Sequence, residues 1–142
     1  MNSEMTDLAR EATTADGYHL MRGMTLTYGE TTVLVTHRLF DRHDIPTGFW
    51  ETEPIEGHLM PRSPHTIHED DEWWPVLDDA ATRGCLLEMV REVWGDPEIH
   101  LDLLRNGIWE VRTGVSSGLA VVAAGGTEAS ALVAALKAGG DQ

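Results

Sequence analysis

Cysteine is almost missing from this sequence, which has Cys85 alone among its 142 residues. One cysteine cannot form an intrachain disulfide, so a disulfide-stabilised secreted scaffold is excluded. Cys85 lies among Leu86, Met89 and Val90, which predicts a buried thiol that packs as a small hydrophobe. A catalytic thiol would need a nearby base and exposure to solvent. A reducing cytoplasm fits this cysteine usage best.

Long apolar runs are missing as well. The longest useful run, from Leu119 to Ala124, is far shorter than the roughly 20 residues of a membrane-crossing helix. Glu4, Asp7 and Glu11 stand where a signal peptide would carry a basic and then an apolar stretch. We therefore expect a soluble, cytoplasmic protein with no membrane partner.

Basic residues are scarce, with 10 Lys and Arg against 24 Asp and Glu, which leaves a formal charge of −14. Such a charge repels nucleic-acid phosphates, so direct nucleic-acid binding is not expected. The imbalance is concentrated in residues 41–79, where eleven acidic and two basic residues give a net charge of −9. This segment is predicted to produce most of the electrostatic field.

The rest of the composition is that of an ordinary folded protein, with 42% hydrophobic and 24% charged residues. A chain of this length is about one domain's worth, so we predict a single domain over residues 1–142. Residues 1–15 are predicted to form a helix, with Ser3 as a possible N-cap and Asp16-Gly17 at its end. Residues 18–40 are rich in β-branched residues around a turn at 28–30, which predicts an antiparallel hairpin.

Residues 41–77 contain five prolines and show no sustained periodicity, which predicts a long acidic connection. Connections of this length tend to be functional or disordered. Phe49, Trp50, Trp73 and Trp74 argue for partial packing of this one.

Residues 78–138 predict a module of helix, hairpin, strand and helix. Asp78 and Asp79 can cap the first helix, Asn106-Gly107 favours a tight hairpin turn, and residues 119–124 suit a more buried strand. Thr127 can cap a final helix that runs to about Ala138. The element order predicts a small α+β domain, in which two hairpins or an antiparallel sheet are packed by two or three helices.

Three features beyond Pro75 carry a resemblance: the stretch VLDDAATRGCLLEMVREVWGDP at 76–97, a strand at Trp109, and a helix start at Thr127-Glu128-Ala129. Residues 75–138 resemble a group of uncharacterised small proteins encoded in phages and prophages of high-GC bacteria. The resemblance implies a shared fold and a phage setting. It implies no activity and no site residues.

Two short motifs are better explained by local structure, the first as a Gly/Ser turn and the second as a capped helix start, than as catalytic or binding sites. Residues 114–118 satisfy G-x-S-x-G, but the last histidine is His100 and the following residues predict a strand where that motif needs a helix. Residues 124–127 precede a helix N-terminus that could hold a phosphate, yet Glu128 would occupy the same positive end. No catalytic residue and no cofactor are predicted.

The densest set of possible metal ligands lies in the long connection. Its members are His58, His65, His68 and Glu69, with further carboxylates after them. A metal needs three or four converging ligands, and a proline-bounded loop could supply them, although the spacing without thiols is not diagnostic. A metal-binding module or a metal-dependent enzyme is therefore one alternative.

The favoured alternative is a protein interface. Its predicted residues are Trp50, Glu69, Asp70, Asp71, Glu72, Trp73 and Trp74. Large aromatics rimmed by carboxylates can anchor an interface, although tryptophans also cover cores and one of the adjacent pair is expected inside. We predict a non-enzymatic phage or prophage accessory protein that contacts a basic host or phage protein, by nucleic-acid mimicry. A self-associating structural subunit is the third alternative.

Overall fold

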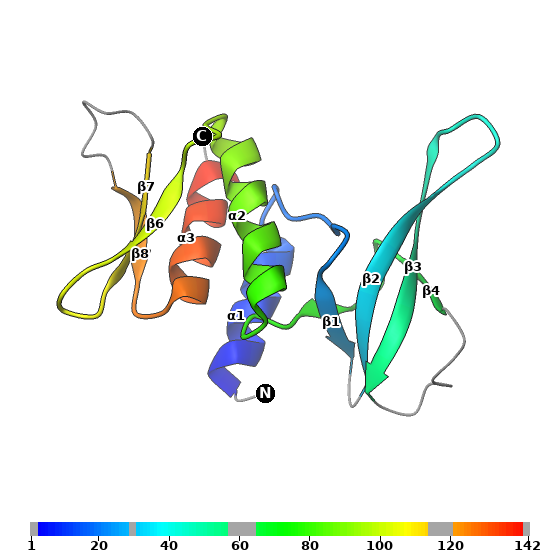
Figure 1. Ribbon diagram of the computed structural model, residues 1–142, viewed down its shortest axis with the longest axis horizontal. Helices are drawn as coiled ribbons and strands as arrows, with labels where there is room; N and C mark the ends of the chain where they lie inside the picture. Colours follow the sequence, from blue (N-terminus) through cyan, green and yellow to red (C-terminus); the bar gives the residue numbers. More distant parts are fainter. Residues whose placement is uncertain (1–2, 29–30, 57–64, 114–120, 141–142) are drawn as a thin grey trace. The chain divides into compact units, whose positions relative to one another are not determined.

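The computed structural model describes residues 3–28, 31–56, 65–113 and 121–140 (Figure 1). The elements within these ranges are α1 (Ser3–Thr14), β1 (Thr25–Tyr28), β2 (Thr31–Phe40), β3 (Pro46–Glu56), β4 (His65–His68), β5 (Trp74–Pro75), α2 (Ala80–Trp94), β6 (His100–Leu103), β7 (Trp109–Arg112), β8 (Val121–Gly125) and α3 (Glu128–Gly140). The strands form two antiparallel sheets, ordered β4-β3-β2-β1-β5 and β6-β7-β8. The predicted α+β class is confirmed.

The chain divides into two compact units, which are described separately. Unit 1 comprises Met1–Tyr18 and Arg83–Gln142, and unit 2 comprises His19–Thr82. The predicted single domain over residues 1–142 stays a prediction.

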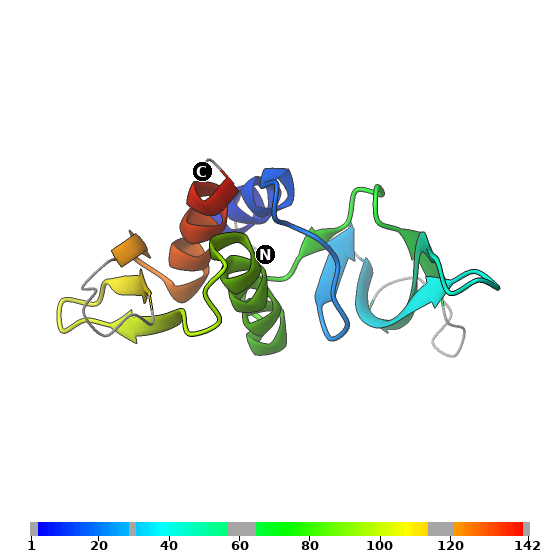
Figure 2. The same cartoon turned by 90° about the horizontal axis from the view of Figure 1, so that it is seen from above.

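Unit 1 is built around three helices, which are blue, green and red in Figure 2. Leu86, Met89 and Val90 are fully buried, as their helical spacing in α2 predicts. The indole Nε1 of Trp94 donates a hydrogen bond of 2.9 Å to the carbonyl of Ala135, which joins α2 to α3. A Cβ at Gly139 would lie 2.1 Å from a methyl carbon of Val93, so the two helices meet where only glycine fits.

The hairpin and the last helix of unit 1 confirm local predictions. Gly107 has φ +84° but Asn106 has no positive φ, so the turn is a three-residue loop in which glycine alone takes the left-handed position. The N–H of Leu104 donates to the carbonyl of Ile108 at 2.8 Å across this loop, and the N–H of Ile108 donates to the Asn106 side chain at 3.0 Å. At the start of α3, Thr127 and Ser130 each accept the other's backbone N–H at 3.0 Å, which forms a reciprocal cap.

The predicted burial of the strand before α3 is wrong. Val121 is 40% exposed, because β8 is an edge strand of a sheet that packs against α3. Residues 119 and 120 and the G-x-S-x-G motif at 114–118 lie outside the described residues.

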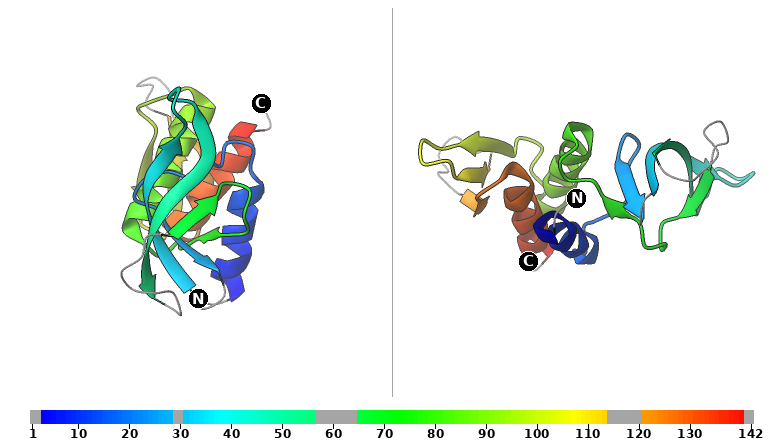
Figure 3. Two further views of the ribbon diagram at one scale, coloured as in Figure 1. Left: turned by 90° about the vertical axis from the view of Figure 1, so that its right-hand side faces the viewer. Right: turned by 90° about the horizontal axis from the view of Figure 1, so that it is seen from below.

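Unit 2 contains the five-stranded sheet, in which β2 and β3 form the long pair seen in Figure 3 (left). The predicted pairing within 18–40 is confirmed, since β1 and β2 are antiparallel. The first strand is shorter than predicted and begins at Thr25. A turn precedes it, closed by a 3.2 Å hydrogen bond from the N–H of Met24 to the carbonyl of Met21, and Gly23 adopts φ +96°.

The prediction that residues 41–77 are a long connection is wrong, because β3, β4 and β5 lie within it. Pro46 is the first residue of β3, and Pro75 lies in the short edge strand β5. Pro54 pairs with β2, and among the described residues β4 pairs with residues 49–52, so Pro54 makes no second ladder hydrogen bond there. Each of these three prolines thus occupies a position where a missing N–H is tolerated.

Candidate interaction surface

Four consecutive acidic residues, Glu69 to Glu72, form an exposed turn between β4 and β5. The turn is held by its own hydrogen bonds. The backbone N–H of Asp71 donates to the carbonyl of His68, and the N–H of His68 donates to the Asp71 carboxylate, both at 2.9 Å. The N–H of Glu69 donates to the carbonyl of Gly48 at 2.8 Å, which fixes the turn to β3. The backbone of the turn and the Asp71 carboxylate are therefore held in place.

Two aromatic rings lie beside this turn. Strand β5 pairs with β1 through Thr27 and Trp74, and this register brings Tyr28 and Trp73 together just beyond the ladder. Their ring centroids are 5.8 Å apart at an interplanar angle of 48°. Tyr28 is 59% exposed and Trp73 is half-buried, so part of each ring stays accessible.

Together these elements form an acidic groove of about 450 Å³, lined by Tyr28, Asp70, Asp71, Glu72 and Trp73. No basic side chain is among these described lining residues. Carboxylates attract a cation, and aromatic faces stabilise a guanidinium or ammonium group placed over them. The groove is therefore suited to an arginine or lysine side chain.

The structure divides the residues of the predicted surface. Asp70, Asp71, Glu72 and Trp73 line the groove, whereas Glu69 is exposed beside it. The other two residues, Trp50 and Trp74, do not line it.

Both remaining tryptophans have other positions. Trp74 in β5 and Trp73 just before it are both half-buried, so the prediction that one of this pair lies inside is wrong. The prediction that Trp50 belongs to the interaction surface is wrong, because its side chain is only 6% exposed. Sequence reasoning missed Tyr28, and no local signal identifies it, because only strand pairing brings it to Trp73.

The predicted metal ligands are only partly within the described residues. His58 and the side chain of His65 lie outside them, although the backbone of His65 begins β4. The Nδ1 of His68 accepts the N–H of Asp70 at 3.1 Å, and its ring packs edge-on against Phe49. In the described part of the chain, no group of three or more metal-ligating side chains is assembled. The metal alternative stays a prediction.

A second chemical feature lies inside unit 1. The hydroxyl of Tyr18 is buried and has no hydrogen-bond partner in the described part of the chain. Burial, with a smaller contribution from Cys85, raises the pKa of this phenol above its ordinary value. Cys85 itself is half-buried, so the prediction of a fully buried thiol is wrong.

A scan against protein-family models finds no match, and searches of curated proteins and of solved structures find none either. The resemblance to phage-encoded proteins therefore stays a prediction. Of the helices in the described residues, none has both the length and the apolar character that crossing a membrane requires.

Proposed function

We propose that this protein acts by protein contact, and that its acidic groove binds a basic segment of a host or phage partner. The observation that supports the proposal most directly is the placement of three carboxylates around the Tyr28–Trp73 pair. The groove complements both features of a bound guanidinium: the carboxylates neutralise its charge, and the aromatic rings stack on its plane.

The electrostatic field supports the same proposal. The formal charge of −14 steers a basic partner toward the protein, and the groove provides the place where that partner is held. A partner that normally binds nucleic acid carries such a basic surface, so the groove would act as a mimic of phosphate charge. The phage or prophage setting of this role rests on the resemblance of residues 75–138.

The proposal is tested with an arginine-rich peptide and the whole chain, by titration calorimetry. We expect binding that weakens as salt rises, since screening acts over about 8 Å at physiological ionic strength. The double variant Asp70→Asn/Glu72→Gln should weaken binding. Asp71 is left in place because its carboxylate holds the turn.

A matched control removes the same charge elsewhere. Glu4→Gln/Asp7→Asn changes two exposed carboxylates of α1 in unit 1, so it removes the same two negative charges but changes no residue that lines the groove. Equal losses of peptide affinity in both double variants would show that binding depends on the overall charge and would contradict binding in the groove. Tyr28→Ala should weaken arginine-peptide binding more than lysine-peptide binding, because the guanidinium stacks better on a ring. Size measurement of the unmodified protein separates self-association from partner binding.

A further inference from the structure

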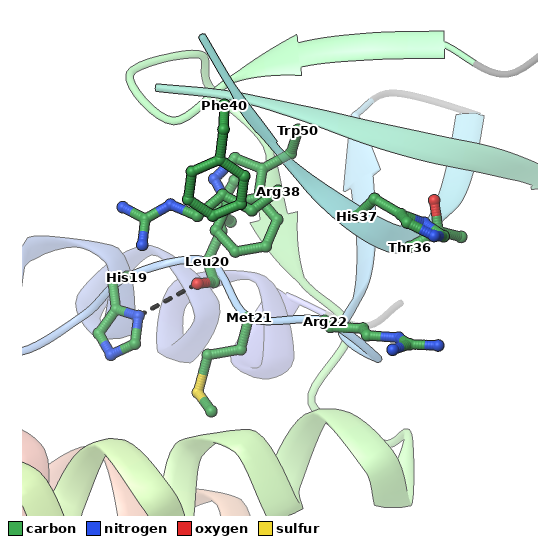
Figure 4. Close-up of a pocket in the computed structure, with 9 residues that line it drawn as sticks. All are labelled: His19, Leu20, Met21, Arg22, Thr36, His37, Arg38, Phe40 and Trp50. Carbon is green, nitrogen blue, oxygen red and sulfur yellow. Dashed lines mark hydrogen bonds between the residues drawn. The ribbon is translucent and has the colours of Figure 1, made fainter. Parts of the chain in front are cut away.

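A second pocket in unit 2 has the opposite charge to the acidic groove. It has a volume of about 470 Å³ and is lined by nine residues from positions 19–22, β2 and β3 (Figure 4). Among them are Arg22, Arg38, His19 and His37, and none of the nine is acidic. In a chain with 24 acidic and 10 basic residues, a pocket that is lined by two arginines and no carboxylate is unusual.

An irregularity in β2 builds this pocket. Val35 pairs with Thr52 and His37 pairs with Glu51, so Thr36 is an extra residue on β2. A bulge of this kind shifts the alternation of side chains along a strand. Arg38 therefore lies on the same face as Val35, directly opposite Trp50 of β3.

Trp50 supplies a buried donor at this place. Its side chain is 6% exposed, and its indole Nε1 has no hydrogen-bond acceptor in the described part of the chain. A buried N–H without an acceptor is costly, and such groups often mark the place of a ligand or an ordered water. Because Nε1 is itself closed to solvent, an oxygen-bearing ligand in the pocket restores this hydrogen bond once neighbouring side chains move aside.

The neighbouring side chains can bind the rest of such a ligand. The guanidinium of Arg38 lies over the Trp50 ring, 5.5 Å from its centroid. Stacking uses the face of a guanidinium and leaves its edge N–H groups able to donate to an oxyanion. Phe40 is 53% exposed and offers an apolar surface at the same pocket.

We propose that this pocket binds a small organic anion, in which carboxylate or phosphate oxygens are attached to a flat apolar body. The oxyanion meets Arg38 and the Trp50 N–H, and the apolar body packs against Phe40. The volume falls within the roughly 300–1,000 Å³ typical of small-molecule sites. Glu51 pairs with His37 across the ladder but does not line the pocket, so the residues that line it carry no negative charge.

The pocket shares no lining residue with the acidic groove, so the two proposals stand or fall separately.

The test follows the indole resonance of Trp50 in proton–nitrogen correlation spectra of the whole chain, assigned by its loss in Trp50→Phe. Benzoate, phenyl phosphate, inorganic phosphate and benzylamine are titrated separately. We expect benzoate or phenyl phosphate to move this resonance with saturation, and benzylamine to leave it unchanged. The stronger of the two anions identifies the preferred oxyanion. A response to inorganic phosphate alone would contradict the need for an apolar body.

Arg38→Gln should weaken anion binding by about tenfold or more, because it removes the charged donor. Arg42→Gln is the matched control, since Arg42 is an exposed arginine near the end of β2 and does not line the pocket. The dispersion of each spectrum reports whether the variant is folded. Equal effects of the two variants, equal binding of benzylamine, or no response to either aromatic anion would overturn the proposal.

Discussion

Replacing Asp79 with alanine should destabilise unit 2 and the start of α2 strongly. The Oδ2 of Asp79 accepts the backbone N–H of Thr82 at 3.0 Å and the Thr82 hydroxyl at 2.7 Å. The Thr82 hydroxyl oxygen in turn accepts the backbone N–H of Thr25 at 2.9 Å, which connects β1 to the helix start. Thr82 has 0% exposure, so no solvent can replace these partners.

The magnitude follows from the interactions that Asp79→Ala removes, which also include a 3.3 Å hydrogen bond from the Thr25 hydroxyl. Loss of a helix N-cap costs about 0.5–2 kcal/mol. A buried hydroxyl that loses its acceptor costs a further ~1–3 kcal/mol. We therefore expect the free energy of unfolding to fall by about 1.5–5 kcal/mol. At roughly 3 °C for each kcal/mol in a chain of this size, the Tm should fall by about 5–15 °C.

Urea titrations followed by far-ultraviolet circular dichroism measure this loss, and the neighbouring residue provides the control. Asp78 is exposed, so Asp78→Ala should change the free energy of unfolding by less than about 0.5 kcal/mol. Asp79→Asn retains an acceptor oxygen and should lose less than Asp79→Ala. Similar losses for the two alanine variants would refute the capping argument.

Three further predictions concern other parts of the chain. Tyr18→Phe removes a buried hydroxyl without a partner in the described residues, so the free energy of unfolding should rise by about 1 kcal/mol. The pKa of the Tyr18 phenol is raised in the folded state, so just above pH 10 only the unfolded state loses this proton. In that pH range the free energy of unfolding of the unmodified protein should fall by about 1.4 kcal/mol per pH unit. Thermal melts of Tyr18→Phe beside Tyr28→Phe test this, and an equal alkaline loss in both would contradict it. Gly48→Ala should lower the free energy of unfolding by more than about 1 kcal/mol, because Gly48 has φ +84° and the new Cβ would lie 2.8 Å from Nε2 of His68. Gly84→Ala, in open space on α2, should raise it by about 0.5–1 kcal/mol. A thiol reagent should label half-buried Cys85 more slowly in the native protein than in urea, and equal rates would contradict its placement.

The sequence by itself determined the features that local chemistry controls. Caps at Asp79 and Thr127 and the Asn106-Gly107 turn each depend on residues a few positions apart. Their side chains meet the same backbone groups whatever the rest of the fold does, so α2, the β6–β7 hairpin and α3 could be predicted. The acidic charge of residues 69–72 could likewise be read directly, because exposed carboxylates need no partner to be recognised.

Only the tertiary structure decided what depends on pairing between distant residues. Because of the prolines of residues 41–77, β3 was not predicted from the sequence. A proline fits in a strand only where no ladder hydrogen bond from its N–H is needed, and the register with the neighbouring strands decides this. The register of β1 with β5 placed Tyr28 beside Trp73, and the register of β2 with β3, through the bulge at Thr36, set Arg38 opposite Trp50. Neither juxtaposition has a local signal, since a shift of one residue would turn each side chain to the other face of the sheet.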